Sequence, residues 1–347
     1  MPQIENLIII SPGFPKDEQD THCLPAQQLF VKMLNRIYPE IQVIILALQY
    51  PPHRNEYTWH GNTVIPFEGL SYWKVFRPLL WRRVGRRLDQ LFHTKNTAVL
   101  SFWLTDTALI GNRFARKYNL PHKCWVMGQD ARRKNPYVLW VNLSKRELIV
   151  LSDFMADEFF RNHGKRPGRI IPLGIDTAAF PPDTVQERTV DVLGVGSLIP
   201  LKRYDIFITV VAALKPSHPN IRAVLCGHGP EETKIRKMIR ALDLEENVVL
   251  TGEVPHSRVL SMMQKSKLFL HPSEYEGYSS ACLEALYAGC HVISFARAEK
   301  RDIDHWHIVA SEYEMIATAS ALFDEEDFSS VLVHRMENSV RDIMKEF

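Results

Sequence analysis

Two glutamates with seven residues between them, Glu276 and Glu284, are the residues whose types and spacing best define a chemistry. If both lie on a helix, a rise of about 1.5 Å per residue separates them by roughly 12 Å. That span exceeds the separation of the two carboxyl groups that glycoside hydrolysis requires. Two carboxylates so far apart instead suit one long ligand that has hydroxyl groups near both ends. A solvated helix with two unrelated glutamates is the alternative.

The segment around these glutamates favours phosphate binding. The apolar run 267–271 predicts a strand, and Ser279 or Ser280 can cap a following helix that ends at Gly289. Gly277 lets the backbone approach a ligand closely, and the N–H groups at a helix start carry a partial positive charge. We therefore expect a nucleotide diphosphate at this helix start.

A lysine and an arginine follow an earlier predicted strand. The run 190–195 leads through Gly196 and Ser197 to Lys202 and Arg203. Because ligands of α/β proteins bind at the carboxyl ends of parallel strands, these cations could neutralise a diphosphate. Solvated charges at a helix start are the alternative. A nearby Gly-Val-Gly sequence lacks the third glycine of a dinucleotide motif and no Walker lysine motif occurs, which excludes NAD and ATP P-loop sites.

Composition predicts a two-domain enzyme. The chain has 347 residues, a formal net charge of +2, 24% charged and 46% apolar residues, so it is neither disordered nor strongly basic. Its five cysteines show no C-x-x-C spacing, which argues against a disulfide framework and a zinc site and favours a reducing cytoplasm. We expect no signal peptide and no membrane span, because neither pattern is present.

Alternating apolar and helical segments predict an α/β fold with parallel sheets. In the first half we expect strands at 7–10, 42–48, 98–102, 124–127 and 148–151, with a helix at 27–34. In the second half we expect strands at 190–195, 223–226, 247–251, 268–271 and 291–295, with helices that begin near Tyr204, after Pro230 and near His256.

The proline-containing polar stretch 176–188 predicts a linker between two domains. We place the N-terminal domain at 1–184 and the C-terminal domain at 185–326. Apolar residues at helical spacing predict one amphipathic helix over 327–347.

Six ordered motifs make the chain resemble a family 4 glycosyltransferase of the GT-B fold. They are Ile171-Pro-Leu-Gly-Ile-Asp176 with Phe180, Gly196-Ser-Leu with Lys202, Gly227-His-Gly-Pro230, Thr251-Gly-Glu-Val-Pro255, Pro272-Ser273, and Glu276-Gly-Tyr-Ser-Ser with Glu284-Ala-Leu-Tyr-Ala-Gly289. The resemblance is strong over 170–295 and weaker before it. It implies two Rossmann-like, doubly wound domains that face each other across a cleft, with the helix 327–347 crossing back to the first domain.

The resemblance also implies a function and a set of site residues. The function is a retaining, metal-independent glycosyltransferase that needs no cofactor, takes a nucleotide-diphosphate sugar (UDP favoured over GDP), and acts on a glycan or lipid-linked glycan acceptor in surface polysaccharide assembly. The implied donor site has Glu276 at the sugar, Glu284 at the ribose, backbone N–H groups of Gly277, Tyr278 and Ser279 at the phosphates, Lys202 at the diphosphate and Val254 near the base, with Gly196, Ser197 and Arg203 around them. The implied acceptor side has Gly13, Phe14, Gln129 and Asp130.

Departures from the family pattern keep other functions open. Ser197 stands where the family often has arginine, and we expect Arg203 to compensate. The usual first-domain histidine is absent, so Asp130 is proposed in its place, beside Glu276 and Lys202 as catalytic residues. A catalytically silent sugar-nucleotide-binding protein and, less favoured, a GT-B nucleotide-sugar epimerase are the alternatives. His228 and His271 are interpreted as structural residues at a turn and a strand end.

The segment 72–92 is the clearest basic cluster of the chain, with six Lys or Arg and one Asp among tryptophans, leucines and phenylalanines. That composition suits an interfacial helix on an anionic membrane, which would accompany a lipid-linked acceptor and a peripheral location on the inner face of the membrane. An ordinary amphipathic helix with solvated arginines is the alternative. We do not expect nucleic-acid binding, because no recognised module surrounds the cluster.

Overall fold

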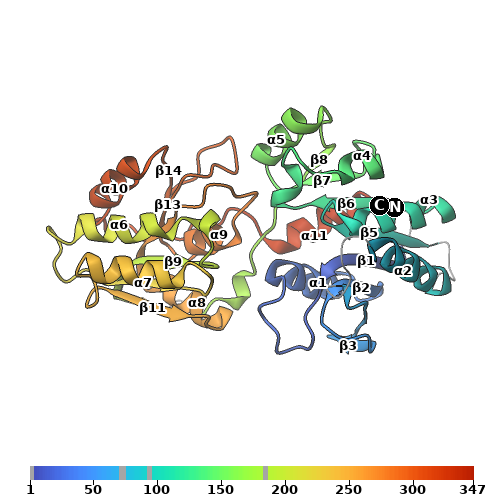
Figure 1. Cartoon of the computed structure of the whole chain (residues 1–347), viewed down its shortest axis with the longest axis horizontal. Helices are drawn as coiled ribbons and strands as arrows, with labels where there is room; N and C mark the ends of the chain where they lie inside the picture. Colours follow the sequence, from blue (N-terminus) through green and yellow to red (C-terminus); the bar gives the residue numbers. More distant parts are fainter. Residues whose placement is uncertain (1–3, 70–75, 92–95, 183–186) are drawn as a thin grey trace. The chain divides into compact units, whose positions relative to one another are not determined.

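The computed structural model describes residues 4–69, 76–91, 96–182 and 187–347. Its chain forms two compact units, Met1–Leu173 with Met336–Phe347, and Gly174–Arg335. Contacts thus divide the chain between Leu173 and Gly174. The predicted boundary between 184 and 185 lies outside the described residues. Both units alternate strands and helices, as expected for an α/β fold (Figure 1).

The first unit is built on one eight-stranded sheet with the order β3-β4-β2-β1-β5-β6-β7-β8, in which only the β3–β4 pair is antiparallel. The strands are β1 (Asn6–Gly13), β2 (Gln42–Tyr50), β3 (Tyr57–Trp59), β4 (Asn62–Pro66), β5 (Thr97–Phe102), β6 (His122–Val126), β7 (Leu148–Val150) and β8 (Arg169–Ile170). The helices are α1 (Pro25–Ile37), α2 (Arg77–Leu91), α3 (Asp106–Tyr118), α4 (Tyr137–Val141), α5 (Asp153–His163) and α11 (Met336–Lys345). The five strands predicted here are present, and the β3–β4 hairpin and β8 are additions.

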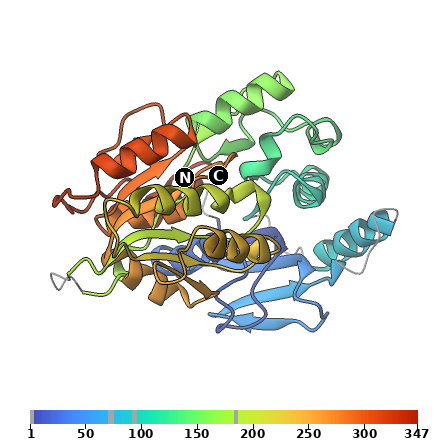
Figure 2. The same cartoon turned by 60° about the vertical axis from the view of Figure 1, so that its left-hand side comes forward.

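Helices cover both faces of this sheet. Apolar residues of α2 and α3, such as Leu80 and Ile110, form one buried cluster with Ile8 and Ile10 of β1. On α1, Phe30 packs its ring against Phe102, with 5.8 Å between the ring centroids. Parallel strands buried on both faces have near-continuous apolar runs, so they offer apolar side chains to the helices on each face. Figure 2 shows α2 at the rim of the first unit.

The predicted C-terminal helix is shorter than expected. Helix α11 spans Met336–Lys345 and packs on α1, and Ser339 Oγ donates a hydrogen bond to the Pro172 carbonyl over 2.8 Å. The prediction of helix from 327 was wrong, because residues before 336 pair with the second unit instead. There, the Val331 N–H donates to the Leu286 carbonyl over 3.0 Å, and Val331 and Val333 pack on a buried cluster. Their spacing of two residues is that of extended chain.

The second unit contains a six-stranded, wholly parallel sheet with the order β11-β10-β9-β12-β13-β14. The strands are β9 (Val190–Val195), β10 (Ala223–Cys226), β11 (Val248–Gly252), β12 (Ser266–His271), β13 (His291–Ser294) and β14 (Trp306–Ile308). The helices are α6 (Tyr204–Leu214), α7 (Glu232–Ala241), α8 (His256–Gln264), α9 (Ser280–Tyr287) and α10 (Glu312–Ala321). Five of the six strands were predicted, and β14 and α10 were not.

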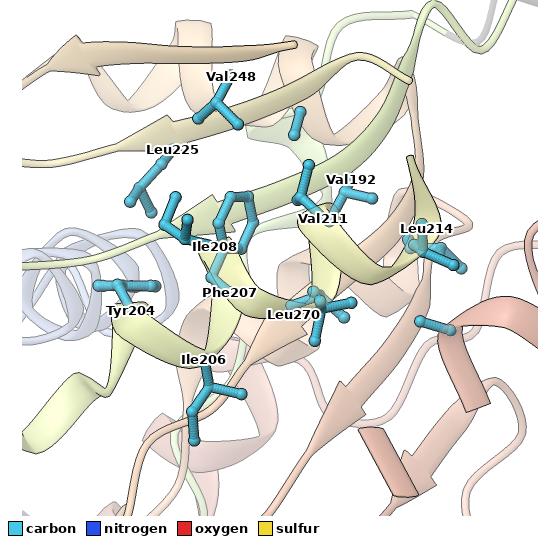
Figure 3. Close-up of a cluster of buried hydrophobic side chains, with 14 of the residues drawn as sticks. Val192, Tyr204, Ile206, Phe207, Ile208, Val211, Leu214, Leu225, Val248 and Leu270 are labelled. Carbon is cyan, nitrogen blue, oxygen red and sulfur yellow. The ribbon is translucent and has the colours of Figure 1, made fainter. Parts of the chain in front are cut away.

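One apolar core joins α6 to the strands of this sheet. Phe207, Ile208 and Val211 of α6 lie against Val192 of β9 and Leu225 of β10 (Figure 3). All five side chains are completely buried. Helices α8 and α9 contribute apolar residues to a second buried cluster with β9, β12 and β13. The sheet is thus packed from both faces, and its loops at the carboxyl ends of the strands are held in place.

Candidate functional site

The loops that follow β9 and β10 touch through their backbones. A Cβ atom on Gly227 would lie 1.9 Å from the Gly196 carbonyl oxygen, and one on Gly229 would lie 2.4 Å from the Leu198 carbonyl oxygen. Only glycine fits at either position. The Leu198 N–H donates to the carbonyl of His228 over 3.0 Å, which fixes the loop after β9. His228 has the turn position that was expected of it.

This loop delivers Lys202 to the loop that follows β12. The Lys202 ammonium donates to Glu276 Oε2 over 2.5 Å. The Glu274 N–H donates to the Leu201 carbonyl over 3.0 Å, so the two loops are also joined through the backbone. Two residues predicted from separate motifs, Lys202 and Glu276, therefore form one pair at the carboxyl edge of the sheet.

His271 is a third member of this cluster that sequence analysis interpreted as structural. Its Nε2 lies 3.2 Å from Glu276 Oε2, and its side chain is 3% exposed. Burial lowers the pKa of His271. Burial also opposes ionisation of Glu276, but the His271 hydrogen bond and the charge of Lys202 outweigh it and hold the pKa of Glu276 at about 2. Glu276 is therefore a carboxylate at neutral pH. In the sequence, His271 is marked only by its position at the last residue of a buried strand, which does not reveal this partner.

Helix α9 begins beside Glu276. Ser279 Oγ accepts a hydrogen bond from the Cys282 N–H over 3.3 Å, which is the N-cap that the sequence predicted. Gly277, Tyr278 and Ser279 are buried. The Tyr278 hydroxyl donates to Glu299 Oε1 over 2.5 Å, so the loop after β13 is tied to the start of α9. Burial raises the pKa of Tyr278, which keeps its hydroxyl protonated.

The second glutamate, Glu284, lies on α9 and pairs with a histidine of α8. His256 Nε2 is 2.8 Å from Glu284 Oε1. This hydrogen bond raises the pKa of His256 against the effect of its burial. Val254, which precedes α8, is half-buried. The two glutamates thus pair with different side chains, Glu276 with Lys202 and Glu284 with His256.

Neither Arg203 nor Ser197 takes part in the Lys202–Glu276 contact. The Arg203 guanidinium binds Asp205 through Nε over 3.2 Å and Glu274 through Nη1 over 3.0 Å. These two carboxylates raise the pKa of Arg203, with the Asp205 hydrogen bond contributing most. Ser197 is exposed at the tip of its loop. Lys202, and not Arg203, is therefore the cation that contacts Glu276.

A small pocket adjoins Glu276 within the second unit. Its lining includes His271, Glu276 and Ser279 together with Ser294 and Trp306. The Trp306 indole donates to Ser294 Oγ over 2.9 Å, which fixes one wall. Sequence analysis named neither of these two residues, since both belong to strands after the last recognised motif.

The residues predicted for the acceptor side have structural contacts in the first unit. Phe14 is completely buried, and its ring packs edge-to-face on Trp59 with 4.8 Å between centroids. Gly13 is buried at the end of β1, and Gln129 is exposed. The ring of Phe14 is thus a core element and offers no surface to a ligand.

Asp130 is a buried carboxyl that holds two backbone groups. Its Oδ2 accepts hydrogen bonds from the Leu104 N–H over 2.7 Å and from the Met127 N–H over 3.1 Å. Burial raises the pKa of Asp130 to about 7, against these two hydrogen bonds. These contacts give Asp130 a structural function, and its catalytic role stays a prediction.

Across the described ranges, no group of three or more His, Cys, Asp or Glu side chains is placed to hold a metal ion. In the same part of the chain, every helix is too short or too polar to cross a bilayer.

Part of the chain matches a known protein family. Residues 177–303 match the model of the family described as "Glycosyl transferases group 1". One subunit of the phosphatidylinositol N-acetylglucosaminyltransferase of Arabidopsis thaliana is 32% identical over 152 residues, which are 43% of this chain and 34% of that protein. This chain thus spans about a third of that relative.

Two solved structures resemble the whole chain. Anabaena HepE in complex with UDP and glucose has a TM-score of 0.67 at 16% identity, and the match covers 98% of this chain and 95% of HepE. The sucrose-phosphate synthase of Thermosynechococcus elongatus has a TM-score of 0.70 at 13% identity and covers 98% of this chain and 94% of the synthase. Such identities establish the fold alone. Residues 177–303 therefore match a glycosyltransferase family, and the chain as a whole has the GT-B fold of these structures.

Proposed function

We propose that this chain transfers a sugar from a nucleotide-diphosphate sugar to an acceptor hydroxyl, and that the second unit holds the donor. In this reaction the bond between the anomeric carbon and the diphosphate oxygen breaks, a bond to the acceptor oxygen forms, and the acceptor loses its proton. The observation that carries the proposal is the Lys202–Glu276 pair, 2.5 Å apart beside the start of α9. A cation, a carboxylate and helix N–H groups meet where open α/β sheets bind ligands.

Each donor group has a matching residue. Lys202 would leave Glu276 to contact the diphosphate and stabilise the negative charge that develops on the leaving group. Glu276, held ionised, would accept hydrogen bonds from hydroxyls of the sugar. Backbone N–H groups from Gly277 to Ser279 would bind the phosphates, and Glu284 would bind the ribose.

We further propose that transfer retains the anomeric configuration, needs no bound metal and prefers UDP-sugars over GDP-sugars. The UDP and glucose bound to HepE, a structure with the same fold, support a uridine nucleotide. Lys202 supplies a fixed positive charge at the diphosphate, which is the contribution that a metal ion would otherwise make.

The proposed acceptor is a glycan or a lipid-linked glycan in surface polysaccharide assembly, reached from the cytoplasmic face of a membrane. The name of the Arabidopsis relative, which belongs to a phosphatidylinositol N-acetylglucosaminyltransferase, supports a lipid-linked acceptor. The sugar and the linkage are left open.

Donor hydrolysis in the absence of acceptor tests this function. We expect slow release of nucleotide diphosphate from one sugar conjugate by the wild type, because water can replace the acceptor hydroxyl. Glu276→Ala should abolish the release, while Glu245→Ala, at an exposed residue between α7 and β11, should retain most of it. Binding without any release would favour the catalytically silent protein, and conversion of the donor sugar to its epimer would favour the epimerase.

A further inference from the structure

The outward face of α2 carries cations that have no acidic partner among the residues that the structure describes. Arg82 and Arg86 are exposed, and within the described residues neither makes an ion pair or a hydrogen bond. Their neighbour Arg87 differs, because it binds Glu56 over 2.6 Å. Lone arginines on one face of a helix leave a positive potential that acts on anions in solution.

Apolar side chains share this face. Leu79 is 57% exposed and Phe76 is 52% exposed. Leu79, Arg82 and Arg86 are three and four residues apart, so they lie on one side of the helix, opposite the buried Leu80 and Val84. An ordinary solvated helix would carry polar residues at the outermost positions, and this helix places a leucine there between arginines.

A groove lies beside this face, between α2 and α3. Trp81 and Gly85 of α2 and Ile110 and Phe114 of α3 line it. The Arg113 guanidinium stands at its edge, 5.8 Å from the centre of the Trp81 ring. The rim also holds Asp89, which is paired with Lys117 over 2.9 Å. An apolar floor with a mainly cationic rim fits the polar–apolar boundary of a phospholipid better than a fully charged ligand.

Helix α4 adds a second exposed apolar group. Leu139 is 84% exposed and Trp140 is 59% exposed. The helix is tied to the first turn of α2, because Arg77 Nη1 lies 2.9 Å from the Tyr137 hydroxyl. Exposed leucine and tryptophan are typical of side chains that insert at a membrane interface.

We propose that the outward face of α2, the groove between α2 and α3, and helix α4 dock the first unit on an anionic phospholipid membrane. The unpaired arginines select the anionic headgroups, and the exposed leucines and aromatic rings enter the interfacial layer. This membrane surface extends the basic segment noted in the sequence to α3 and α4, and it does not depend on the sugar chemistry of the second unit.

Vesicle flotation of the full chain tests the charge half of the proposal. We expect binding to vesicles of phosphatidylcholine mixed with phosphatidylglycerol, little binding to phosphatidylcholine alone, and weaker binding at about 1 M salt, where the Debye length falls to about 3 Å. Arg82→Gln with Arg86→Gln should weaken partitioning by roughly 30-fold, since each basic residue near an anionic surface contributes about fivefold. The matched control is Lys237→Gln with Arg240→Gln, two exposed cations of α7.

A second pair of variants tests the apolar half. Leu139→Ser with Trp140→Ser should remove the binding that survives in salt, whereas Tyr313→Ser, at an 81% exposed aromatic residue of α10, should leave it unchanged. Thermal melting of each variant without ligand, compared with the wild type, reports that the fold is intact. The proposal is overturned if the chain fails to float with anionic vesicles at low salt. It is also overturned if the control variants lose as much binding as the test variants. The exposed apolar residues would then fit a protein partner.

Discussion

The carboxyl groups in the loops and helix of the second unit's site have different hydrogen-bond partners from Asp130 in the first unit. In the second unit, Glu276 and Glu284 bind the side chains of Lys202 and His256, over 2.5 Å and 2.8 Å. In the first unit, Asp130 binds two backbone N–H groups. A ligand can replace a side-chain partner by a rotamer change, but a backbone partner can be released only if the loop rearranges. Exchangeable partners therefore indicate a binding site, and backbone partners indicate a structural role.

The largest effect is expected at Phe14, which tests whether this side chain of the first unit has a structural role. Phe14→Ala removes a completely buried ring from the Trp59 contact and should lower the free energy of unfolding by about 3 to 5 kcal/mol. Chemical denaturation measures it. If the variant unfolds like the wild type but loses transfer activity, the side chain serves the acceptor and the comparison fails.

The second prediction concerns the two neighbouring cations. Lys202→Gln should reduce kcat by about 10²- to 10³-fold, because the leaving group loses a fixed charge. Arg203→Gln should reduce it by less than about 10-fold, because Asp205 and Glu274 already hold that guanidinium. Steady-state rates at saturating donor measure both. Equal losses would show that Arg203 does compensate for Ser197.

The third prediction separates structure from catalysis at Asp130. Asp130→Ala leaves the N–H groups of Leu104 and Met127 without an acceptor and should cost about 2 kcal/mol of unfolding free energy. Asp130→Asn keeps an oxygen acceptor and should retain activity. A loss of 100-fold or more in kcat for the amide, with unchanged stability, would instead support the catalytic prediction.

The stability of the wild type should also depend on pH through the titration of Asp130. Burial raises the pKa of Asp130 to about 7, so the folded state binds its proton more tightly than the unfolded chain does. Stability from this group therefore falls as pH rises from about 4 through about 7. Melting temperatures near pH 6 and pH 8 should show a decrease in the wild type that is smaller in Asp130→Asn.

The smallest effect is expected at His256. Its pKa is raised by Glu284, so the pair stabilises the second unit fully below about pH 6.5 and less as pH rises through the raised pKa. Because the His256 side chain is 42% exposed, we expect no more than about 1 kcal/mol. Melting of the wild type and His256→Gln across this range measures it, and parallel curves would contradict the assignment.

Much of the second unit could be predicted from the sequence. The bounds of β9 and β10 and the first residues of α6 and α8 agree with the predictions, because buried parallel strands have continuous apolar runs with clear breaks. The β3–β4 hairpin was missed, although His60 and Gly61 both have the positive φ of its turn, because its strands are short. The stretch before α11 was mistaken for helix because extended chain that packs on a buried cluster also needs apolar residues.

The candidate site was predictable where glycines and loops specify it. Gly227 and Gly229 allow the loops after β9 and β10 to touch, and the Glu274 N–H joins the loop that carries Lys202 to the loop that carries Glu276. The contribution of His271 could not be derived, since a buried histidine at a strand end has the same local pattern with or without a partner. The roles of Asp130 and Phe14 depend on contacts from distant parts of the first unit, which no local motif reveals.

Calorimetric titration of UDP into the wild type, Glu284→Gln and Arg203→Gln tests the central claim, that the second unit is a nucleotide-sugar site. We predict measurable binding to the wild type and weakening by about 10- to 100-fold in Glu284→Gln, because a charged acceptor for two ribose hydroxyls is lost. Arg203→Gln should bind within about threefold of the wild type, since its guanidinium already has partners. Binding to Glu284→Gln that equals the wild type, or no binding of UDP, GDP, ADP or CMP to any of the three, would contradict the claim.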